Sequence, residues 1–478
     1  MAKYRQKGDK TLIMFNKSKI IQILNSKYPL LSILIGTALV LVTIGTFENG
    51  DTEWEFQATL GVMRWGMPYV NNFGNIMDQP PLGFYTSAFF FKFFGASADT
   101  GVILVTLFGL GAIIVLYKVG KILYGKTTAL FAATLFALTP WYLVLSRSFL
   151  IDTQCLFLSL LCLFVGMLAI RKDSLKLSVG AGVLFAAALL TKLYAVFMFI
   201  PVAMFYFFGG KNLKRSLNLL VGFCLPAIVL GFLWYEVISG QGLLSVFNHG
   251  DFSNPNYANV VPSYFFVINF LGDYGLGWPL LAASIMSLSI GILGRKQFAK
   301  TLKFDLICIV IIVIVVGVNT FLGATLNLKS PYNNAIKFDY QLLPFFSLSA
   351  ASLAGKCLVL FHSAKTKSRF SKWSLFIVVF TGIFLLCAAL FVNMQVAQQL
   401  SRSDYLIFKV ERNMDVGYSL FNFDLVTHSN FTNIIQYLGF SLILSGILWA
   451  FKQKIRDAFQ PMQTWIKTKN ALPTTQQQ

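Results

Sequence analysis

The chain is poor in charged residues and in histidine, and this scarcity excludes a soluble globular protein. Only 12% of its 478 residues are Asp, Glu, Lys or Arg, and three are histidine. A soluble domain carries about 25% charged residues. Because 56% of the chain is hydrophobic and phenylalanine alone contributes 48 residues, a water-soluble core could not bury this surface beneath a polar shell. We therefore expect an integral membrane protein.

Cysteine motifs and glycine-rich phosphate loops are also missing. None of the six cysteines forms a CxxC pair, and each lies in or beside an apolar run, at positions 155, 162, 224, 308, 357 and 387. Such cysteines act as small hydrophobic residues and exclude a disulfide framework or a zinc knuckle. Without a loop that cradles phosphates, the sequence offers no site for a soluble nucleotide sugar.

Acidic residues are half as common as basic ones, and the two signs are segregated along the chain. The sequence has 39 Lys and Arg against 19 Asp and Glu, and 29 of the 39 fall in seven segments. These segments are 1–27, 118–126, 171–176, 209–216, 295–303, 362–373 and 452–478. Because positive residues resist translocation, we predict a multi-pass cell-membrane protein with both termini cytoplasmic. A basic stripe that would bind nucleic acid is not expected.

Apolar runs of about 17–25 residues mark membrane helices. We expect twelve spans, at 28–47, 100–117, 127–145, 150–170, 177–191, 194–209, 217–237, 274–294, 304–323, 339–361, 374–392 and 433–451. The first run is too long for the apolar region of a signal peptide and is predicted to be a signal anchor. The fold class is therefore all-α, a polytopic transmembrane bundle. Its transmembrane domain spans 28–451, between a basic tail at 1–27 and a second tail at 452–478.

Polar residues concentrate in the loops on the outer side, which are unequal in length. The first outer loop, 48–99, and the last large one, 393–432, are both long, whereas the predicted cytoplasmic loops are short. Helical spacing of Trp54, Ala58, Val62 and Trp65 predicts a short helix that lies in the membrane interface. A second apolar helix is predicted at 82–94, so the outer loop is structured.

Four acids lie within the eight residues 48–55, directly after the first span. A solvated helix start explains such a cluster, because acids are favourable near a helix N-terminus. The alternative is catalytic: Asp51 lies at the membrane boundary, where a general base could meet a lipid-borne substrate. The sequence leaves both interpretations open at this point.

Two further charged elements follow in the chain. Asp78 and Gln79 precede two prolines, which hold them rigidly above a helix N-terminus. Arg147 and Asp152 lie in a tight hairpin between two apolar spans, either as a structural ion pair or as functional residues. A plain turn remains the alternative for the proline element.

Lys192 and residues 337–344 complete the set of candidates. Lys192 is a single basic residue in an abrupt turn within an apolar stretch, where snorkelling to the headgroups is the alternative to function. Lys337 and Tyr340 enter a span from outside. His249 is one of the three histidines and lies in an outer loop.

Together these elements resemble the GT-C membrane glycosyltransferases of the protein mannosyltransferase and aminoarabinose transferase type. The resemblance rests on the order of five motifs on the outer face and is strongest over residues 45–200. The motifs are an acid after the first span (51), D/E-[KQ]-P-P-L (78–82), R-x(4)-D (147–152), L-T-K (190–192) and [KR]-x-x-Y-x-L-x-P (337–344).

The resemblance implies a hexosyl- or pentosyltransferase that uses a polyprenyl-phosphate sugar. The sugar would pass, with inversion, to a lipid, glycan or protein acceptor at the outer leaflet. Asp51 would be the general base and Asp152 the second acid, while Arg147 and Lys192 would hold the donor phosphate. A transporter or flippase of a lipid-linked or anionic substrate is the alternative, and it would show charged residues within its spans.

The chain departs from the family at two positions. The family's adjacent acid pair is here Asp51-Thr52-Glu53, so the resemblance leaves open whether Glu53 replaces Asp51 or is idle. Gln79 stands where close relatives have a lysine, and this moves phosphate binding to Arg147, Lys192 or Lys337. Gln79 and Tyr340 remain candidates for substrate contacts.

No cofactor follows from the sequence itself. Some relatives bind a metal through the acid before the prolines and a later loop histidine. Asp78 and His249 match these positions. The resemblance therefore implies that these two residues could bind a divalent metal.

Overall fold

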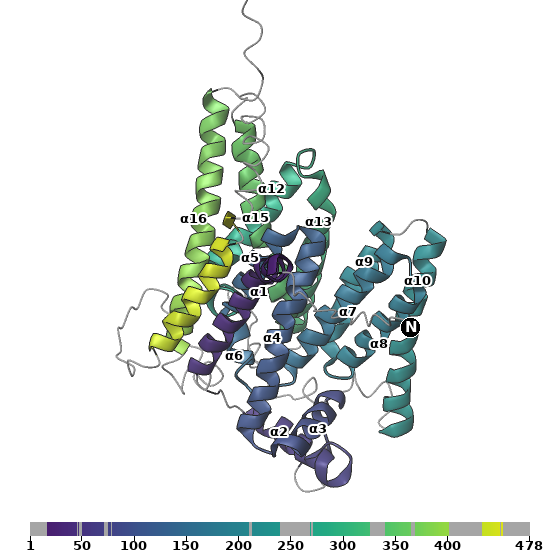
Figure 1. The fold of residues 1–478 in the computed structure, drawn as a ribbon. Coiled ribbons are helices and arrows are strands. Elements are labelled where there is room, and N and C mark those ends of the chain that lie inside the picture. The colour runs from purple at the N-terminus through teal and green to yellow at the C-terminus, as the bar shows by residue number, and fades with distance from the viewer. Residues whose placement is uncertain are drawn as a thin grey trace, which may run out of the picture.

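The computed structural model describes residues 17–44, 46, 50–70, 75–77, 79–209, 213–239, 268, 271–325, 340–364, 369–400, 433–449 and 451–452. Helices dominate this part of the chain (Figure 1), and the sheet found within it is a single two-stranded antiparallel ribbon. The predicted all-α class is confirmed.

The longer helices form the body of the molecule. They are α1 (Lys17–Thr43), α4 (Ala98–Leu123), α7 (Asp152–Lys172), α8 (Leu175–Leu189), α10 (Leu213–Phe232), α12 (Trp278–Leu293), α13 (Ala299–Thr325), α15 (Leu343–Ala364), α16 (Arg369–Leu400) and a C-terminal helix, Asn433–Trp449. The shorter elements are α2 (Gly50–Trp65), β1 (Tyr69–Val70), β2 (Asn75–Ile76), α3 (Leu82–Phe94), α5 (Lys126–Ala137), α6 (Pro140–Leu145), η1 (Leu193–Met198), α9 (Phe199–Gly209), η2 (Leu233–Ile238), η6 (Leu271–Gly275) and η7 (Tyr340–Leu342).

Every predicted span coincides with a helix of the described chain. By length and composition, five helical stretches can cross a membrane, and they are Ala98–Leu123, Asp152–Lys172, Leu213–Ile238, Tyr340–Leu360 and Leu375–Gln398. Shorter apolar helices and α13 lie at the positions of the other predicted spans. The span predicted at 127–145 is divided, because Pro140 begins α6 after α5 has ended. The polytopic bundle is thus confirmed.

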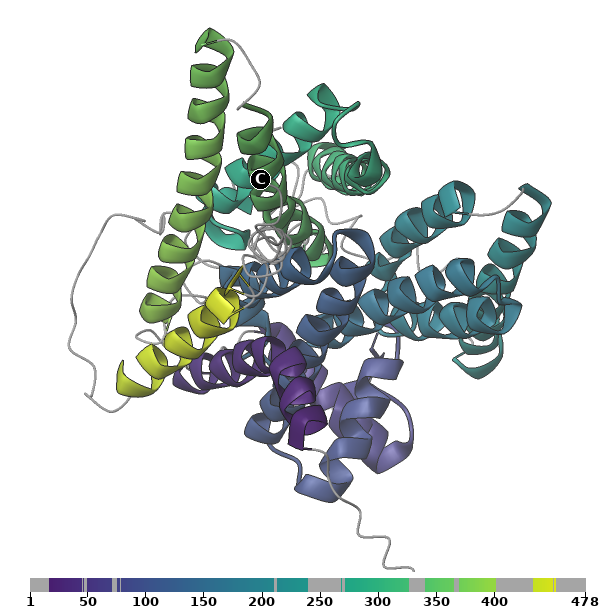
Figure 2. The same ribbon diagram turned by 45° about the horizontal axis from the view of Figure 1, so that its top comes forward.

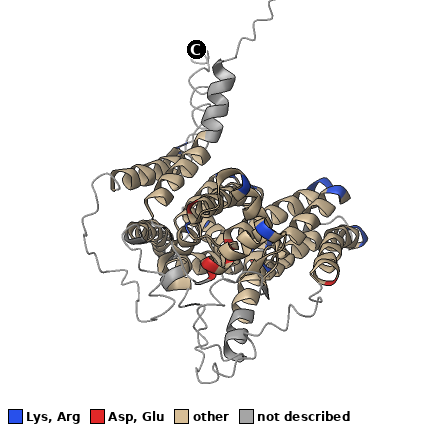
Figure 3. Ribbon diagram, turned by 90° about the horizontal axis from the view of Figure 1, so that it is seen from below, with Lys and Arg blue, Asp and Glu red and all other residues tan. Residues whose placement is uncertain are grey.

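Large apolar side chains cover the outer faces of α10 and α16. Val221 and Ile228 on α10 are 63% and 66% exposed, and Phe380 and Phe384 on α16 are 63% and 61% exposed. In Figure 3 charged residues occupy few short parts of the ribbon. Such faces suit contact with lipid hydrocarbon rather than water, because in lipid there is no hydrophobic driving force to bury apolar side chains.

The first and last described helices pack closely, as Figures 1 and 2 show for the purple and yellow ribbons. Glycines allow this approach: a Cβ added at Gly36 would lie 2.5 Å from the carbonyl oxygen of Gly439. Ser32 adds a hydrogen bond of 2.5 Å from its hydroxyl to the Leu442 carbonyl. Small residues at helix contacts are typical of association in membranes. This contact closes one side of the bundle with segments from both ends of the chain.

Helices α2 and α3 form a cap at one end of the bundle, at the bottom of Figure 1. Ala58 of α2 and Phe84 of α3 are fully buried and belong to one apolar cluster with Ile151, which immediately precedes α7. Gly66 ends α2 with φ +76°, and its carbonyl accepts a hydrogen bond of 2.6 Å from the Tyr85 hydroxyl. The cap is therefore packed onto the start of α7.

The two predicted helices of the first outer loop are present. Helix α2 starts at Gly50, before the predicted apolar stripe begins at Trp54, and α3 has the predicted bounds, 82–94. The apolar stripe predicted on the first of them is divided in the structure. Ala58 is buried, whereas Trp54 and Trp65 are 46% and 39% exposed. Both tryptophans keep part of their surface exposed, and their contact with the membrane interface stays a prediction.

Candidate active site

Glu55 is the acid of the 48–55 cluster that the fold buries. It lies in the second turn of α2 and is 0% exposed, because α2 packs this face onto the start of α7. Its Oε2 accepts a hydrogen bond of 2.8 Å from the backbone N–H of Ile151. That N–H belongs to the residue before α7, so the carboxylate meets a helix N-terminus, where negative charge is favourable.

Asp152 is the first residue of α7 and is also 0% exposed. Its Oδ2 lies 2.6 Å from Nζ of Lys192, and its Oδ1 accepts a hydrogen bond of 2.8 Å from the Tyr194 hydroxyl. Both carboxylate oxygens therefore have partners from the turn that follows α8. The ion pair that the sequence offered between Arg147 and Asp152 is not the one found, since Asp152 pairs with Lys192.

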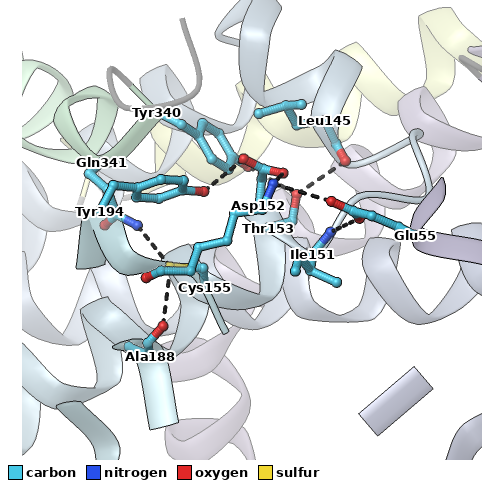
Figure 4. A network of polar contacts seen from close by, with 11 residues as sticks. Glu55, Leu145, Ile151, Asp152, Thr153, Cys155, Ala188, Tyr194, Tyr340 and Gln341 are labelled. Carbon is cyan, nitrogen blue, oxygen red and sulfur yellow. Dashed lines mark hydrogen bonds and ion pairs between the residues drawn. The ribbon is translucent and has the colours of Figure 1, made fainter. Parts of the chain in front are cut away.

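Lys192 lies between the two carboxylates. It is 6% exposed, and its Nζ is 3.2 Å from Oε1 of Glu55 as well as 2.6 Å from Oδ2 of Asp152. The turn that carries it is rigid: the Lys192 N–H donates to the Ala188 carbonyl, and the Lys192 carbonyl accepts from the Ala195 N–H. Figure 4 shows how side chains from α2, α7 and the turn after α8 converge. We refer to Glu55, Asp152 and Lys192 as the buried triad.

The triad carries two acids for one base. With all three groups ionised its net charge is one negative, and all three side chains are buried. Burial raises the pKa of Glu55 to about 7, and the neighbouring ammonium of Lys192 opposes this without cancelling it. Glu55 therefore binds its proton more tightly than an ordinary glutamate does.

A layer of hydroxyl and sulfur groups surrounds Asp152. Thr153 donates to the Leu145 carbonyl at 3.1 Å, and its hydroxyl lies 3.4 Å from that of Tyr340, which is fully buried. The Gln341 amide donates to Sγ of Cys155 at 3.5 Å. These contacts bring η7, far along the chain, against the start of α7. The structure thus places the predicted residue Tyr340 beside the triad.

The two acids predicted for catalysis on α2 have different surroundings. Asp51 is half-buried and lies one helical turn before Glu55, on the same face of α2. Glu53 is exposed, and its carboxylate accepts a hydrogen bond of 3.2 Å from Gln57 on the same helix. The structure therefore aligns Asp51 with the triad and turns Glu53 away from it.

Arg147 and Gln79 belong to the segments that precede α7 and α3. The half-buried Arg147 donates from Nε to the Ile44 carbonyl at 3.1 Å, at the end of α1. Oε1 of Gln79 is buried and has no hydrogen-bond partner within the described residues. Leu82, which begins α3 after the prolines, donates its N–H to the Leu190 carbonyl at 2.8 Å. The proline element is thus tied to the turn that carries Lys192.

Three predicted site residues, Asp78, His249 and Lys337, lie outside the described residues. The part of the chain that the structure describes holds no group of three His, Cys, Asp or Glu side chains arranged for a metal ion. The metal expected at Asp78 and His249 therefore stays a prediction.

Glu55 is the site residue that the sequence analysis did not single out. Its spacing of four residues from Asp51 was a usable signal, because residues four apart share a face of a helix. This spacing could not by itself identify the buried acid, because the same helix also carries Glu53. The packing of α2 determines which acid is buried.

Comparison with known proteins supports the resemblance inferred from the sequence. Residues 78–235 match the model of the dolichyl-phosphate-mannose-protein mannosyltransferase family. This segment includes Asp152 and Lys192 but not α2. A Bacillus subtilis (strain 168) protein named "Putative mannosyltransferase YycA" is 28% identical over 147 residues, which is 30% of this chain and 22% of that protein. The chain thus spans about a fifth of the length of this curated relative.

Solved structures extend the likeness to almost the whole chain. ArnT from Cupriavidus metallidurans, bound to undecaprenyl phosphate, superposes with a TM-score of 0.51 at 13% sequence identity. The match covers 93% of this chain and 80% of ArnT, and the apo state of ArnT gives the same values. At this identity the likeness establishes the fold. The chain therefore has the GT-C membrane glycosyltransferase fold, and its residues 78–235 resemble the protein mannosyltransferases.

Proposed function

We propose that this protein is a membrane glycosyltransferase that transfers a sugar from a polyprenyl-phosphate donor to a lipid, glycan or protein acceptor. The observation that carries the proposal is the buried triad, which lies at the capped end of a GT-C fold. Two of its members fall in the segment that matches the mannosyltransferase family. Fixed charges in a site without water act strongly on a reaction in which charge develops.

The chemistry of the proposed step assigns a role to Asp51. The acceptor oxygen bonds to the anomeric carbon from the side opposite the phosphate, while the bond between that carbon and the phosphate oxygen breaks. The bonding electrons leave with the phosphate, and Asp51 takes the proton of the acceptor hydroxyl. The products are the glycosylated acceptor, with inverted configuration, and the polyprenyl phosphate. Asp51 suits this role because it is only half-buried and therefore reachable.

We assign the donor phosphate to Arg147 rather than to Lys192. Two carboxylates already hold the ammonium of Lys192, and the triad as a whole is negative. A phosphate placed against it would meet repulsion. Arg147 uses Nε for the Ile44 carbonyl, and a guanidinium has further N–H donors that suit a phosphate. Lys337 remains a second candidate, and the role first predicted for Lys192 stays a prediction.

The direct test is release of the lipid carrier. Purified protein in lipid nanodiscs would receive undecaprenyl-phosphate mannose, because the family match is to mannosyltransferases, followed by other undecaprenyl-phosphate sugars. An extract of membranes from the expressing cells would supply acceptors. We expect free undecaprenyl phosphate together with labelled acceptor. If no sugar of the panel is transferred, whereas the protein moves an intact lipid-linked substrate across vesicles, the transporter alternative holds. That alternative has no comparable support from the fold or the family match.

We further propose that the cap faces the outside of the cell membrane and that both termini are cytoplasmic. The basic segments listed from the sequence support this orientation. In a variant without native cysteines, Trp65→Cys on the cap and Lys296→Cys between α12 and α13 are both exposed positions. A membrane-impermeant thiol reagent added to intact cells should label the first and spare the second. The reverse pattern would invert the topology.

A further inference from the structure

Glu55 is an acid that the proposed step does not use, although the fold buries it completely. Removing a carboxylate from water is costly unless other groups compensate for the lost hydration. Compensation here comes from the Ile151 N–H at 2.8 Å and the Lys192 ammonium at 3.2 Å. Neither partner belongs to α2. Glu55 therefore joins its helix to two other segments of the chain.

The contacts of Glu55 restrain how α2 is turned about its own axis. One partner precedes α7 and the other lies in the turn between α8 and η1, so a rotation of α2 would break both contacts at once. Beside Glu55, Ala58 is also fully buried, and Thr59 donates its hydroxyl to the Glu55 carbonyl at 2.8 Å. Other acids of α2 lack such a role: Glu53, two residues earlier, is exposed.

Asp51 depends on this restraint because of its position. Residues four apart on a helix are neighbours on one face, with Cβ atoms about 5–6 Å apart. The orientation that inserts Glu55 into the triad therefore also sets the direction of Asp51. We infer that Glu55 is a positioning residue for the transfer step: through Lys192 and the start of α7 it fixes the orientation of α2, and so of Asp51. The inference rests on the proposed function.

The charge state of Glu55 controls the strength of this restraint. The groups that face it are Lys192, from the turn after α8, and Asp152, from α7, and the Tyr194 hydroxyl donates to Asp152. An ionised Glu55 attracts Lys192, and a neutral one loses that attraction.

The first experiment compares wild type, Glu55→Gln and Glu236→Gln, using undecaprenyl-phosphate mannose in nanodiscs as the probe. Glu236 is an exposed acid on η2 and serves as a matched control. In Glu55→Gln we expect kcat to fall by about 100-fold, the loss typical of a misplaced catalytic group, with KM for the donor nearly unchanged. Glu236→Gln should match wild type. Glu55→Asp keeps the charge and should retain part of the wild-type kcat.

Two results in this assay would overturn the inference. One is a Glu55→Gln protein with full kcat. The other is a Glu55→Gln protein as inactive as Asp51→Asn while its α2 is as well ordered as in wild type, which would make Glu55 the base itself.

A second measurement does not depend on activity, and it separates this inference from the proposed function. Hydrogen–deuterium exchange over residues 50–65 should be faster in Glu55→Gln than in wild type and unchanged in Glu236→Gln. Equal exchange in all three proteins would overturn the positioning role even if transfer is observed. Faster exchange in an enzyme without transfer activity would retain the restraint and reject the proposed function. If Glu55→Gln does not fold, Glu55→Asp takes its place in both measurements.

Discussion

At the scale of single residues, the triad shows how a lysine can be retained in a buried turn. Lys192 has a carboxylate at 2.6 Å on one side and another at 3.2 Å on the other. Removing one partner of a buried ion pair typically costs about 3–5 kcal/mol, because the other charge stays buried without compensation. Lys192 therefore stabilises the site by pairing with both buried carboxylates.

Asp51→Asn tests the base of the proposed step. The substitution keeps the shape of the side chain and removes its ability to take a proton, so transfer should fall by about 10²–10⁴-fold. Donor binding and folding should persist. The measurement is the rate of undecaprenyl phosphate release, with Glu53→Gln as the comparison. A well-folded and nearly fully active Asp51→Asn protein would contradict the assignment, and a dead Glu53→Gln protein would move the base by two residues.

The pKa of Glu55 also predicts how stability varies with pH. This pKa is about 7 in the folded protein against 4.5 for an ordinary glutamate. Between these values the folded protein keeps a proton that the unfolded chain has lost, so stability contributed by the protonated form is lost as the pH rises from 4.5 through 7. The Tm of wild type should therefore fall more between about pH 5 and pH 8 than that of Glu55→Gln. Equal changes in the two proteins would argue against the raised pKa.

The sequence predicts some of these residues and not others, for physical reasons. Asp152 and Lys192 stand out because a charge within an apolar hairpin needs a partner or a function. Glu55 lies among three other acids, and nothing local distinguishes it. Its burial depends on which face of α2 packs against the start of α7. The spacing of residues in the sequence does not determine this tertiary contact.

At the scale of the elements, the contact between α1 and the C-terminal helix should depend on glycine. A methyl group at Gly36 would meet the Gly439 carbonyl at 2.5 Å and the Ile443 side chain at 2.7 Å. Gly36→Ala should therefore lower stability by about 1–3 kcal/mol, as overpacking does. Gly180 on α8 has nothing within 4 Å, so Gly180→Ala should be neutral or stabilising by about 0.5–1 kcal/mol. Thermal unfolding checks both, and equal effects would contradict the packing.

A second buried ion pair joins α13 to α15 away from the triad. Nζ of Lys356 lies 2.9 Å from Asp305 and donates to the Ser287 carbonyl at 2.7 Å, while the Tyr124 hydroxyl donates to Asp305 at 3.0 Å. Lys356→Met should destabilise the protein by about 3–5 kcal/mol, and adding Asp305→Leu should recover much of this loss. Thermal unfolding of the single and double variants checks the coupling. A double variant that is less stable than the single one would contradict it.

At the scale of the whole molecule, hydropathy was sufficient to predict the helical bundle. It did not predict that the span at 127–145 is divided into two helices. The twelve apolar runs coincide with helices because a span needs a fixed length of apolar chain. The division of one span at Pro140 follows from a residue visible in the sequence. By contrast, the approach of η7 to α7 joins positions 187 residues apart, Tyr340 and Thr153, and no local pattern predicts such a contact.

The central claim, that the donor phosphate binds at the capped end of the bundle beside the triad, is tested most directly by an experimental structure of the full chain with undecaprenyl phosphate in nanodiscs. The account predicts density for the phosphate at the capped end of the bundle, within hydrogen-bond distance of Arg147 and on the Asp51 side of α2. The ion pair of Glu55 with Lys192 should be intact beside it. Phosphate density at the opposite end of the bundle, or an α2 turned so that Glu55 leaves Lys192, would contradict the account.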